Sequence, residues 1–179
     1  MLSRRDVLKQ FLLVSAGAVL IPSCLQEKNK ATVALKNIRI NGDQEKMLGD
    51  IAETFLPRTD TPGAKDLAAH LFVLRMVDDC FSKENQQKFV KGLEDFERYV
   101  TTKYQQSFSD CSLATKNEIF KGLEDPKGNS QDREFFYFSV KYLTIEAYTT
   151  SQFYLTKIHI YKLVPGHFQG CVPVSQADS

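Results

Sequence analysis

Residues 130–153 read SQDREFFYFSVKYLTIEAYTTSQF and form the densest aromatic stretch of the chain. Polar and apolar side chains recur here at three- and four-residue steps, so the spacing predicts a helix over residues 132–151. The expected polar face consists of Glu134, Tyr137, Lys141, Thr144 and Tyr148. The expected apolar face consists of Phe135, Phe136, Tyr142, Leu143 and Phe153. A helix with so wide an apolar face has to pack against most of the other elements, and we expect it to be the spine of the core.

Two helices are predicted before it, on either side of a proline-containing loop. The first begins near Asp43 and ends at Pro57, because proline cannot continue a helix. The second is expected to begin inside the loop, with Thr61 as its cap and Pro62 at its first position, where the missing N–H costs nothing. The side chains expected to face the core are Met47, Ile51, Phe55, Leu67, Leu71, Leu74 and either Val77 or Cys80.

Two more helices are predicted between this pair and the aromatic stretch. Ser82 is expected to cap the longer one and Ser112 the shorter one, which is broken by Asp-Pro-Lys-Gly at residues 125–128. Their expected core residues are Phe89, Leu93, Phe96, Val100, Ile119, Phe120 and Leu123. Strand-like alternation is nearly absent. The sequence therefore predicts an all-α fold, a single compact bundle of about five helices with an irregular C-terminal tail.

Composition limits the size of the core and the class of partner. The chain has 179 residues, of which 42% are hydrophobic, which suits one core rather than two. The formal net charge is +1, and it becomes −1 without residues 1–23, which carry three basic side chains and one acidic one. A nucleic-acid partner would require a basic stripe. A near-neutral surface therefore argues against such a partner.

The first 23 residues are expected to be an export signal rather than part of the fold. Arg4 and Arg5 precede an apolar run over residues 11–21, which is shorter than the roughly 20 residues that span a bilayer. The arginine pair resembles a twin-arginine signal. Ile-Pro-Ser before Cys24 resembles a lipobox, in which that cysteine is acylated and becomes the new N-terminus. The alternative is an ordinary cysteine in a discarded peptide.

These features give the expected domain boundaries. Residues 1–23 are the signal peptide, and residues 24–42, which are polar and without a clear period, are a tether that lifts the domain off the membrane. Residues 43–179 are the helical domain. The expected location is the periplasmic side of a membrane, with a lipid anchor.

No motif for catalysis or cofactor binding is present. The chain has no Gly-x-Gly-x-x-Gly dinucleotide fingerprint and no Cys-x-x-Cys-His haem attachment site. His159, His167 and Cys171 could be drawn together around a metal, but three ligands at loose spacing are a poor zinc signal. Asp78 and Asp79 are expected to be solvated charges near a helix end rather than an acid–base pair. We therefore expect no catalytic, cofactor or metal site in this chain.

Several short motifs, taken in order and spacing, carry a family resemblance. They are FLPRTDTPGA at 55–64, MVDDC at 76–80, GL at 92–93, LTIEAYTTS at 143–151, PG at 165–166 and GCVP at 170–173. Together they resemble the gluconate 2-dehydrogenase subunit 3 family over most of the mature chain. The family more often has glycine where this chain has Ala147, so a close helix contact there is expected to be slightly looser.

The resemblance implies a small accessory subunit of a periplasmic, membrane-associated sugar or polyol dehydrogenase. Such a subunit accompanies a large flavoprotein of the glucose-methanol-choline (GMC) type, which holds the FAD, often with a multihaem cytochrome c as electron acceptor. In this family the small subunit is thought to assist maturation or export of that partner. A twin-arginine signal on a cofactor-free chain fits this role, because the flavoprotein must take up its cofactor before it crosses the membrane.

Two other classes of function stay open. The first is a free-standing periplasmic lipoprotein that acts only as a binding or scaffold module. The second is an enzyme in its own right, which would require a convergent polar pocket that the sequence does not indicate.

Three cysteines remain in the mature domain once Cys24 is lipidated. In an oxidising compartment an odd number leaves at least one of them free or bonded outward. Cys80 is expected on the buried face of its helix, whereas Cys111 precedes a helix cap and could reach a neighbour. An internal pair between two of the three stays open. Cys171, in a turn set by glycine and proline, is the best outward candidate, and the resemblance agrees because some relatives join the small and catalytic subunits by a disulfide.

Glu146 is a further interface candidate. It shares the helical phase of Phe135 and Leu143, where a carboxylate is costly unless it is paired or hydrogen-bonded. Either it pairs within the bundle or reaches water, or this face meets the partner and Glu146 pairs across the interface.

Overall fold

The computed structural model describes residues 30–124, 129–159, 161–163, 166 and 170–171. Its elements are α2 (Gly42–Phe55), α3 (Ala69–Cys80), α4 (Lys83–Tyr104), the 3₁₀ turn η2 (Phe108–Asp110), α5 (Leu113–Glu124), α6 (Gln131–Thr149) and the π-helical turn η3 (Tyr154–Ile158). Within these residues the only β pairing is an isolated bridge between Lys30 and Asn41. The predicted all-α bundle of about five helices is confirmed. None of the described helices has the length and hydropathy to cross a bilayer.

Side-chain caps fix where several helices begin, and two of the predicted caps are confirmed. Ser82 accepts the backbone N–H of Asn85 at the start of α4, at 3.3 Å. Ser112 accepts that of Thr115 at the start of α5, at 3.2 Å. Ser130 caps α6 in the same way. Each oxygen satisfies one of the N–H groups that the first helical turn leaves without a partner.

The predicted start of α3 is wrong. The helix begins at Ala69, behind Ala68 in a left-handed backbone conformation, whereas Thr61 and Pro62 belong to the preceding loop. Leu67 also lies in this loop and Leu71 is only half-buried. The buried side chains of α3 are Ala69, Val73, Leu74, Val77 and Asp78.

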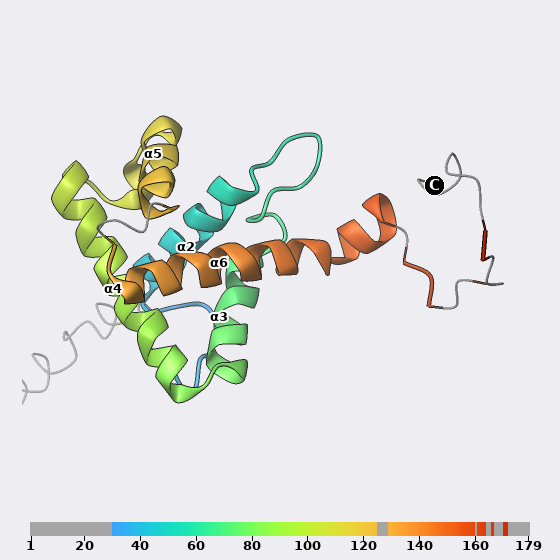
Figure 1. The fold of residues 1–179 in the computed structure, drawn as a ribbon, viewed down its shortest axis with the longest axis horizontal. Helices are drawn as coiled ribbons and strands as arrows, with labels where there is room; N and C mark the ends of the chain where they lie inside the picture. The colour runs from blue at the N-terminus through green and yellow to red at the C-terminus, as the bar shows by residue number, and fades with distance from the viewer. Residues whose placement is uncertain (1–29, 125–128, 160, 164–165, 167–169, 172–179) are drawn as a thin grey trace, which may run out of the picture.

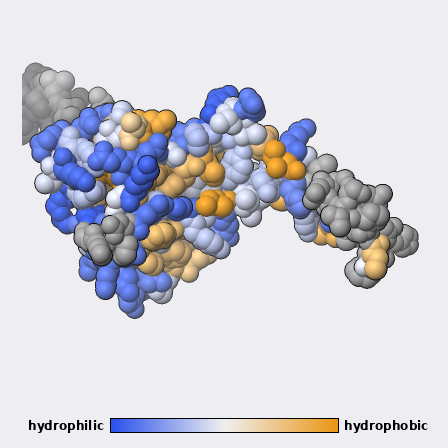
Figure 2. Space-filling view, turned by 45° about the horizontal axis from the view of Figure 1, so that its top comes forward, coloured by the Kyte–Doolittle hydropathy of each residue, from blue (hydrophilic) through white to orange (hydrophobic). Residues whose placement is uncertain are grey.

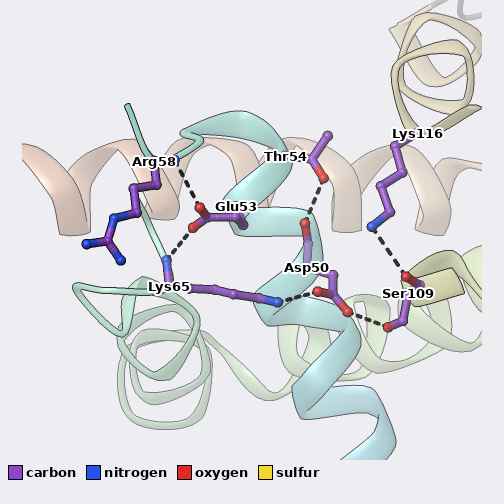
Figure 3. A network of polar contacts seen from close by, with 7 residues as sticks. All are labelled: Asp50, Glu53, Thr54, Arg58, Lys65, Ser109 and Lys116. Atoms are coloured by element: carbon purple, nitrogen blue, oxygen red, sulfur yellow. Dashed lines mark hydrogen bonds and ion pairs between the residues drawn. The ribbon is translucent and has the colours of Figure 1, made fainter. Parts of the chain in front are cut away.

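Two carboxylates of α2 hold the loop and explain the late start of α3 (Figure 3). Glu53 accepts the backbone N–H groups of Arg58 and Lys65 at 3.0 and 2.8 Å, so the backbone between them stays bent against α2. Asp50 accepts from the Lys65 ammonium and from the Ser109 hydroxyl. Burial alone would raise the pKa of Asp50, but these two partners outweigh it and lower the pKa below its ordinary value.

Helix α6 is the spine of the bundle, as predicted. In Figure 1 it runs across the near side of the body, with α2 and α3 behind it and α4 crossing near its first turns. Its most extensive contacts are with α4 and then with α3. Near its other end, Ala147 meets Ala52, Ala64 and Ala69, so small side chains allow a close helix contact there.

The predicted polar face of α6 is wrong. Tyr137 is 2% exposed and Thr144 is 0% exposed, whereas Tyr142, which was expected to be buried, is 68% exposed. The buried face consists of Arg133, Phe136, Tyr137, Val140, Leu143, Thr144 and Ala147. Tyr137 can be buried because its hydroxyl donates to Glu124 at 2.9 Å while its ring packs against Phe120.

The crossing of α4 and α6 depends on a residue without a side chain. A Cβ atom on Gly92 would meet the Asp132 carbonyl oxygen and would lie 2.6 Å from the Cβ of Phe136. Both contacts are with atoms close to the α6 backbone, which cannot turn away. Glycine therefore sets the distance between the two helices, and this distance lets Phe136 reach Phe89 and Phe96 in the core.

Residues 30–41, which belong to the expected tether, lie against the helical body. We call them the strap. Two buried carboxylates bind its backbone. Asp78 of α3 accepts the N–H groups of residues 36–38 at 2.7 to 2.9 Å, and Glu45 of α2 accepts that of Thr32 at 2.7 Å. Residues 24–29 lie outside the described part of the chain, so a tether there stays a prediction.

The prediction of a solvated Asp78 is therefore wrong, although its neighbour Asp79 is exposed. Burial alone would raise the pKa of Asp78, but the three backbone N–H groups and the charge of Lys36 lower it below its ordinary value. Gln86 of α4 donates to the Asp78 carbonyl oxygen at 2.7 Å, so Asp78 links the strap and α3 to α4 as well. Asp78 is thus a structural anchor for the strap.

We expect Gly92→Ala to lower the free energy of unfolding by about 2 kcal/mol or more, because the added methyl group would push α4 away from α6. Helix propensity alone predicts the opposite sign, a gain of up to about 1 kcal/mol. Gly122→Ala in α5 is the matched control, since its nearest neighbour would be the Tyr99 hydroxyl at 3.6 Å. Urea denaturation measures both variants. Equal effects at the two positions would contradict the close-approach explanation.

We expect Asp78→Asn to destabilise the fold by about 2–4 kcal/mol, because an amide keeps one acceptor oxygen and turns an NH₂ group toward strap N–H groups. The exposed neighbour offers the control: Asp79→Asn should change the stability by less than about 0.5 kcal/mol.

The stability contribution of Asp78 should also depend on pH in a defined direction. Because the pKa of Asp78 is lower in the folded state than in the unfolded state, the ionised carboxylate stabilises the fold at pH values above the unfolded-state pKa of about 4. This stabilisation is lost as the pH falls through the folded-state pKa. The stability difference between the wild type and Asp78→Asn should therefore shrink in acid. A difference that stays constant down to acid pH would rule out the charge as its source.

Candidate docking surface

An uncovered row of apolar side chains runs along the outer face of α6. Phe135, Phe138, Tyr142 and Ile145 follow one another at steps of three, four and three residues, and we call this row the α6 stripe. Phe138, Tyr142 and Ile145 are exposed, while Phe135 packs partly against the core. In Figure 1 no described helix lies in front of α6. The helix therefore presents one apolar face to its own core and a second one to the outside.

A shallow groove of about 560 Å³ lies along this stripe. Phe81, from the turn between α3 and α4, forms its far wall, with its ring 6.1 Å from that of Phe135. The other lining residues include Gln131, Glu134, Ser139 and Leu143. Figure 2 shows orange hydrophobic patches across the middle of one face of the molecule and further ones on the arm that extends to the right.

The chemistry of this surface suits binding rather than catalysis. Aromatic rings and one aliphatic side chain line it, and contiguous exposed apolar surface on a soluble domain marks an interaction site. Aromatic anchors of this kind carry most of the energy in protein interfaces. Two carboxylates flank the row: Glu134 lines the groove, and half-buried Glu146 follows Ile145 directly. Neither carboxylate has an ion-pair partner among the described residues.

The C-terminal end of α6 continues this outward-facing surface. Figure 1 shows α6 and η3 extending beyond the body of the bundle. There Tyr148 contacts Phe153 and Tyr154 edge to face, with ring centroids 6.4 and 6.1 Å apart. The exposed large hydrophobic side chains that follow are Ile158, Tyr161 and Leu163. The aromatic contacts at this end of the molecule leave these three side chains exposed.

The cysteine environments differ from the predictions. Cys80 is exposed at the end of α3, directly before Phe81 of the groove, and the expectation that it is buried is wrong. Cys111 is buried and donates to the carbonyl oxygen of Ser107, so it cannot reach a neighbour as expected. Burial raises the pKa of the Cys111 thiol and keeps it protonated. Cys171 is exposed, and each of the three is a free thiol here.

Several predicted site residues lie outside the described part of the chain. They are Arg4, Arg5 and Cys24 of the signal region, the helix break at 125–128, His167, and residues 172–173 of the tail. Within the described ranges, no three or more His, Cys, Asp or Glu side chains gather as metal ligands would. The sequence pattern did not place the α6 stripe on the outside, because Phe135 and Tyr142 were assigned to the apolar face expected to be buried, although the aromatic residues of this helix were interpreted as core or interface.

No curated protein and no solved structure matches this sequence. Residues 42–166, from the first residue of α2 to beyond η3, match the family described as gluconate 2-dehydrogenase subunit 3. This match spans well over half of the chain and includes the whole helical bundle with its α6 stripe. The resemblance carried by the short motifs is therefore confirmed, and the chain belongs to the gluconate 2-dehydrogenase subunit 3 family.

Proposed function

We propose that this chain is the non-catalytic small subunit of a membrane-associated periplasmic dehydrogenase, and that it binds the large FAD-dependent subunit through the α6 stripe. The family is that of a subunit of a multi-subunit dehydrogenase, which supports the accessory role. The observation that carries the docking surface is the exposed row of aromatic side chains on α6, which has no cover within the described chain. The flavin and the sugar or polyol oxidation belong to the partner.

The polar groups of the bundle support a role without chemistry of its own. Asp50, Glu53, Asp78 and Glu45 are the carboxylates that form the main polar clusters, and each is engaged by backbone N–H groups or by structural side chains. A general acid or base has to face a substrate with a free lone pair or proton. These carboxylates instead hold the loop and the strap in place.

The partner's chemistry also follows from the surface. The α6 stripe requires an apolar patch on the flavoprotein, and Glu134 and Glu146 favour basic side chains at the rim of that patch. Cys171 stays the predicted outward disulfide partner, and exposed Cys80 beside the groove is a second candidate. A multihaem cytochrome c would accept electrons from the flavoprotein and need not contact this chain.

The same proposal includes export and anchoring. Arg4 and Arg5 would direct the chain to the twin-arginine pathway together with the folded flavoprotein, and acylation of Cys24 would then anchor the pair to the membrane. In the alternative, the chain is a free-standing periplasmic lipoprotein that acts as a scaffold. The observation that favours the accessory role over this alternative is the family match.

For docking, we expect Tyr142→Ser and Ile145→Ser each to weaken binding of the large flavoprotein subunit by roughly tenfold or more, because each removes an exposed apolar anchor. Leu113→Ser is the matched control, since Leu113 of α5 is 63% exposed, much like Tyr142. The large subunit is coexpressed from the gene that the accessory role predicts beside the gene for this chain, and the complex is measured by co-purification and titration. All three isolated variants should melt near the wild-type temperature.

Two outcomes would count against the proposal in different ways. If Leu113→Ser weakens the complex as much as the stripe variants do, the α6 stripe is not the docking surface. If the wild-type chain binds no flavoprotein at all, the accessory role itself fails and the free-standing lipoprotein remains.

For maturation, we expect cleavage before Cys24 and acylation of its thiol and amino group. The apolar run at 11–21 is too short to anchor the chain by spanning the bilayer, while several acyl chains together give firm anchoring. Mass spectrometry of the mature N-terminus should find a lipid-modified cysteine, and Cys24→Ser should make the protein extractable from the membrane fraction by high salt alone, without detergent. An intact Met1 on the mature protein would exclude this processing.

A further inference from the structure

A second surface, which the docking proposal does not use, lies between the strap and the first half of α4. A groove of about 610 Å³ runs between these two segments. Four cationic side chains line it, two from each side: Lys36 and Arg39 from the strap, and Lys83 and Lys91 from α4. One acidic residue, Glu94, lies at the same groove. We call this feature the basic groove.

The four cations of the basic groove have no ion-pair partners within the described chain. All four are exposed. Glu84, which follows Lys83 directly in the sequence, is already paired with Lys88 at 2.8 Å. Lys36 does feel the charge of Asp78, but the oxygens of that carboxylate are taken by strap N–H groups. The groove is therefore a local concentration of positive charge on a chain of nearly neutral balance.

The strap wall of the basic groove is held in place by hydrogen bonds to α3 and α4. Asp78 holds residues 36–38 in place, and Gln86, which lines the groove, donates to the Asp78 carbonyl oxygen. The first residue of the strap, Lys30, pairs with its last residue, Asn41, in an isolated β-bridge. Asn41 is two residues beyond Arg39, so the entry point at Lys30 lies close to Arg39. The entry point and the basic groove therefore share one end of the molecule.

The chain between Cys24 and this entry point is short. Five residues lie between Cys24 and Lys30, so six residue-to-residue steps join them, and an extended chain spans at most about 3.5 Å per step. An acyl chain on Cys24 would thus keep the strap within about 20 Å of the bilayer. Electrostatic attraction between cations and anionic lipids acts over about 8 Å at physiological salt, so a tethered groove is within reach of the headgroups.

We propose that the basic groove binds the phosphate-bearing headgroups of an anionic membrane surface, so that the domain rests on the membrane in a fixed orientation instead of swinging on its anchor. Arg39 can hold a phosphate through two parallel N–H bonds, and the three lysines supply point charges around it. The proposal extends the anchoring by Cys24, but the charge of the groove does not depend on acylation.

The orientation has a consequence for the partner. Lys83 of the basic groove and Phe81 of the α6 groove are two residues apart in the turn between α3 and α4. The two surfaces therefore adjoin along this turn. A membrane-bound basic groove would hold the α6 stripe, and a flavoprotein bound to it, beside the bilayer.

The test uses the mature-length chain, residues 24–179, carrying Cys24→Ser so that no acyl chain contributes. Sedimentation with vesicles should show partition onto vesicles containing 30 mol% phosphatidylglycerol, and little onto pure phosphatidylcholine. The double variant Lys83→Gln/Lys91→Gln should lower the partition coefficient about tenfold or more, since each of the two lysines contributes a comparable share of the attraction to the anionic surface. The matched control, Lys121→Gln/Lys157→Gln, removes the same charge from exposed positions on α5 and η3 and should bind like the unsubstituted chain.

Each contrary result would overturn the proposal. Equal loss in both double variants would mean that net charge, and not the groove, sets binding, and equal partition onto both kinds of vesicle would exclude headgroup charge. Displacement by millimolar inorganic phosphate, beyond the effect of sodium chloride at the same ionic strength, would indicate a site for free phosphate rather than for a membrane. Circular dichroism should show that every variant is folded. Partition that is unaffected by raising the salt to about 0.5 M would also contradict an electrostatic contact.

Discussion

The close approach of α4 and α6 at Gly92 is the constraint on which the rest of the bundle depends. The absence of a side chain lets the first turns of α6 lie almost against the α4 backbone, and polar contacts hold the same crossing from outside the core. Asp95 of α4 accepts from Ser130 at 2.5 Å and pairs with Arg133 at 3.5 Å, while the Arg133 guanidinium lies 4.4 Å from the centre of the Tyr99 ring. Because the crossing is at the beginning of α6, the remaining turns extend over α3 and α2 and then past them.

Carboxylates, rather than hydrophobic contacts alone, determine how the non-helical segments lie on this frame. Glu53 bends the loop before α3, and Glu45 and Asp78 hold the strap by its backbone N–H groups. Glu45 and Asp78 replace water that the strap backbone would otherwise require, which makes removal of one of their oxygens far more costly than removal of a surface charge. The same bonds occupy these two buried acids in holding the strap.

How much could be predicted from the sequence depended on whether local periodicity had a single interpretation. The core side of α4 was predictable because Phe89, Phe96 and Val100 recur with apolar residues on one face only, and the caps at Ser82 and Ser112 follow from short-range bonding. In α6 apolar side chains occur on both faces, so the pattern could not say which face was inside, and Tyr137 was misplaced because Glu124, which satisfies its hydroxyl, is distant in sequence. The position of Asp78 was missed for the same reason, since the strap residues it binds lie about forty positions earlier.

The inner apolar face of α6 is covered by the bundle, whereas the outer one needs a partner to cover it. This difference bears on how an accessory subunit can work. The inner face is covered by α2, α3 and α4, and its rings contact core rings on α4 and α5. Phe135 and Phe138 of the α6 stripe add to this packing, while Tyr142 and Ile145 stay exposed. The chain can therefore fold before it meets a partner, and docking would need no rearrangement of the core. The outer face is narrow and bordered by carboxylates, and it leaves Tyr142 and its neighbours exposed. The proposed export together with a folded flavoprotein would require both properties, because the subunit would have to be stable alone and then present a preformed surface.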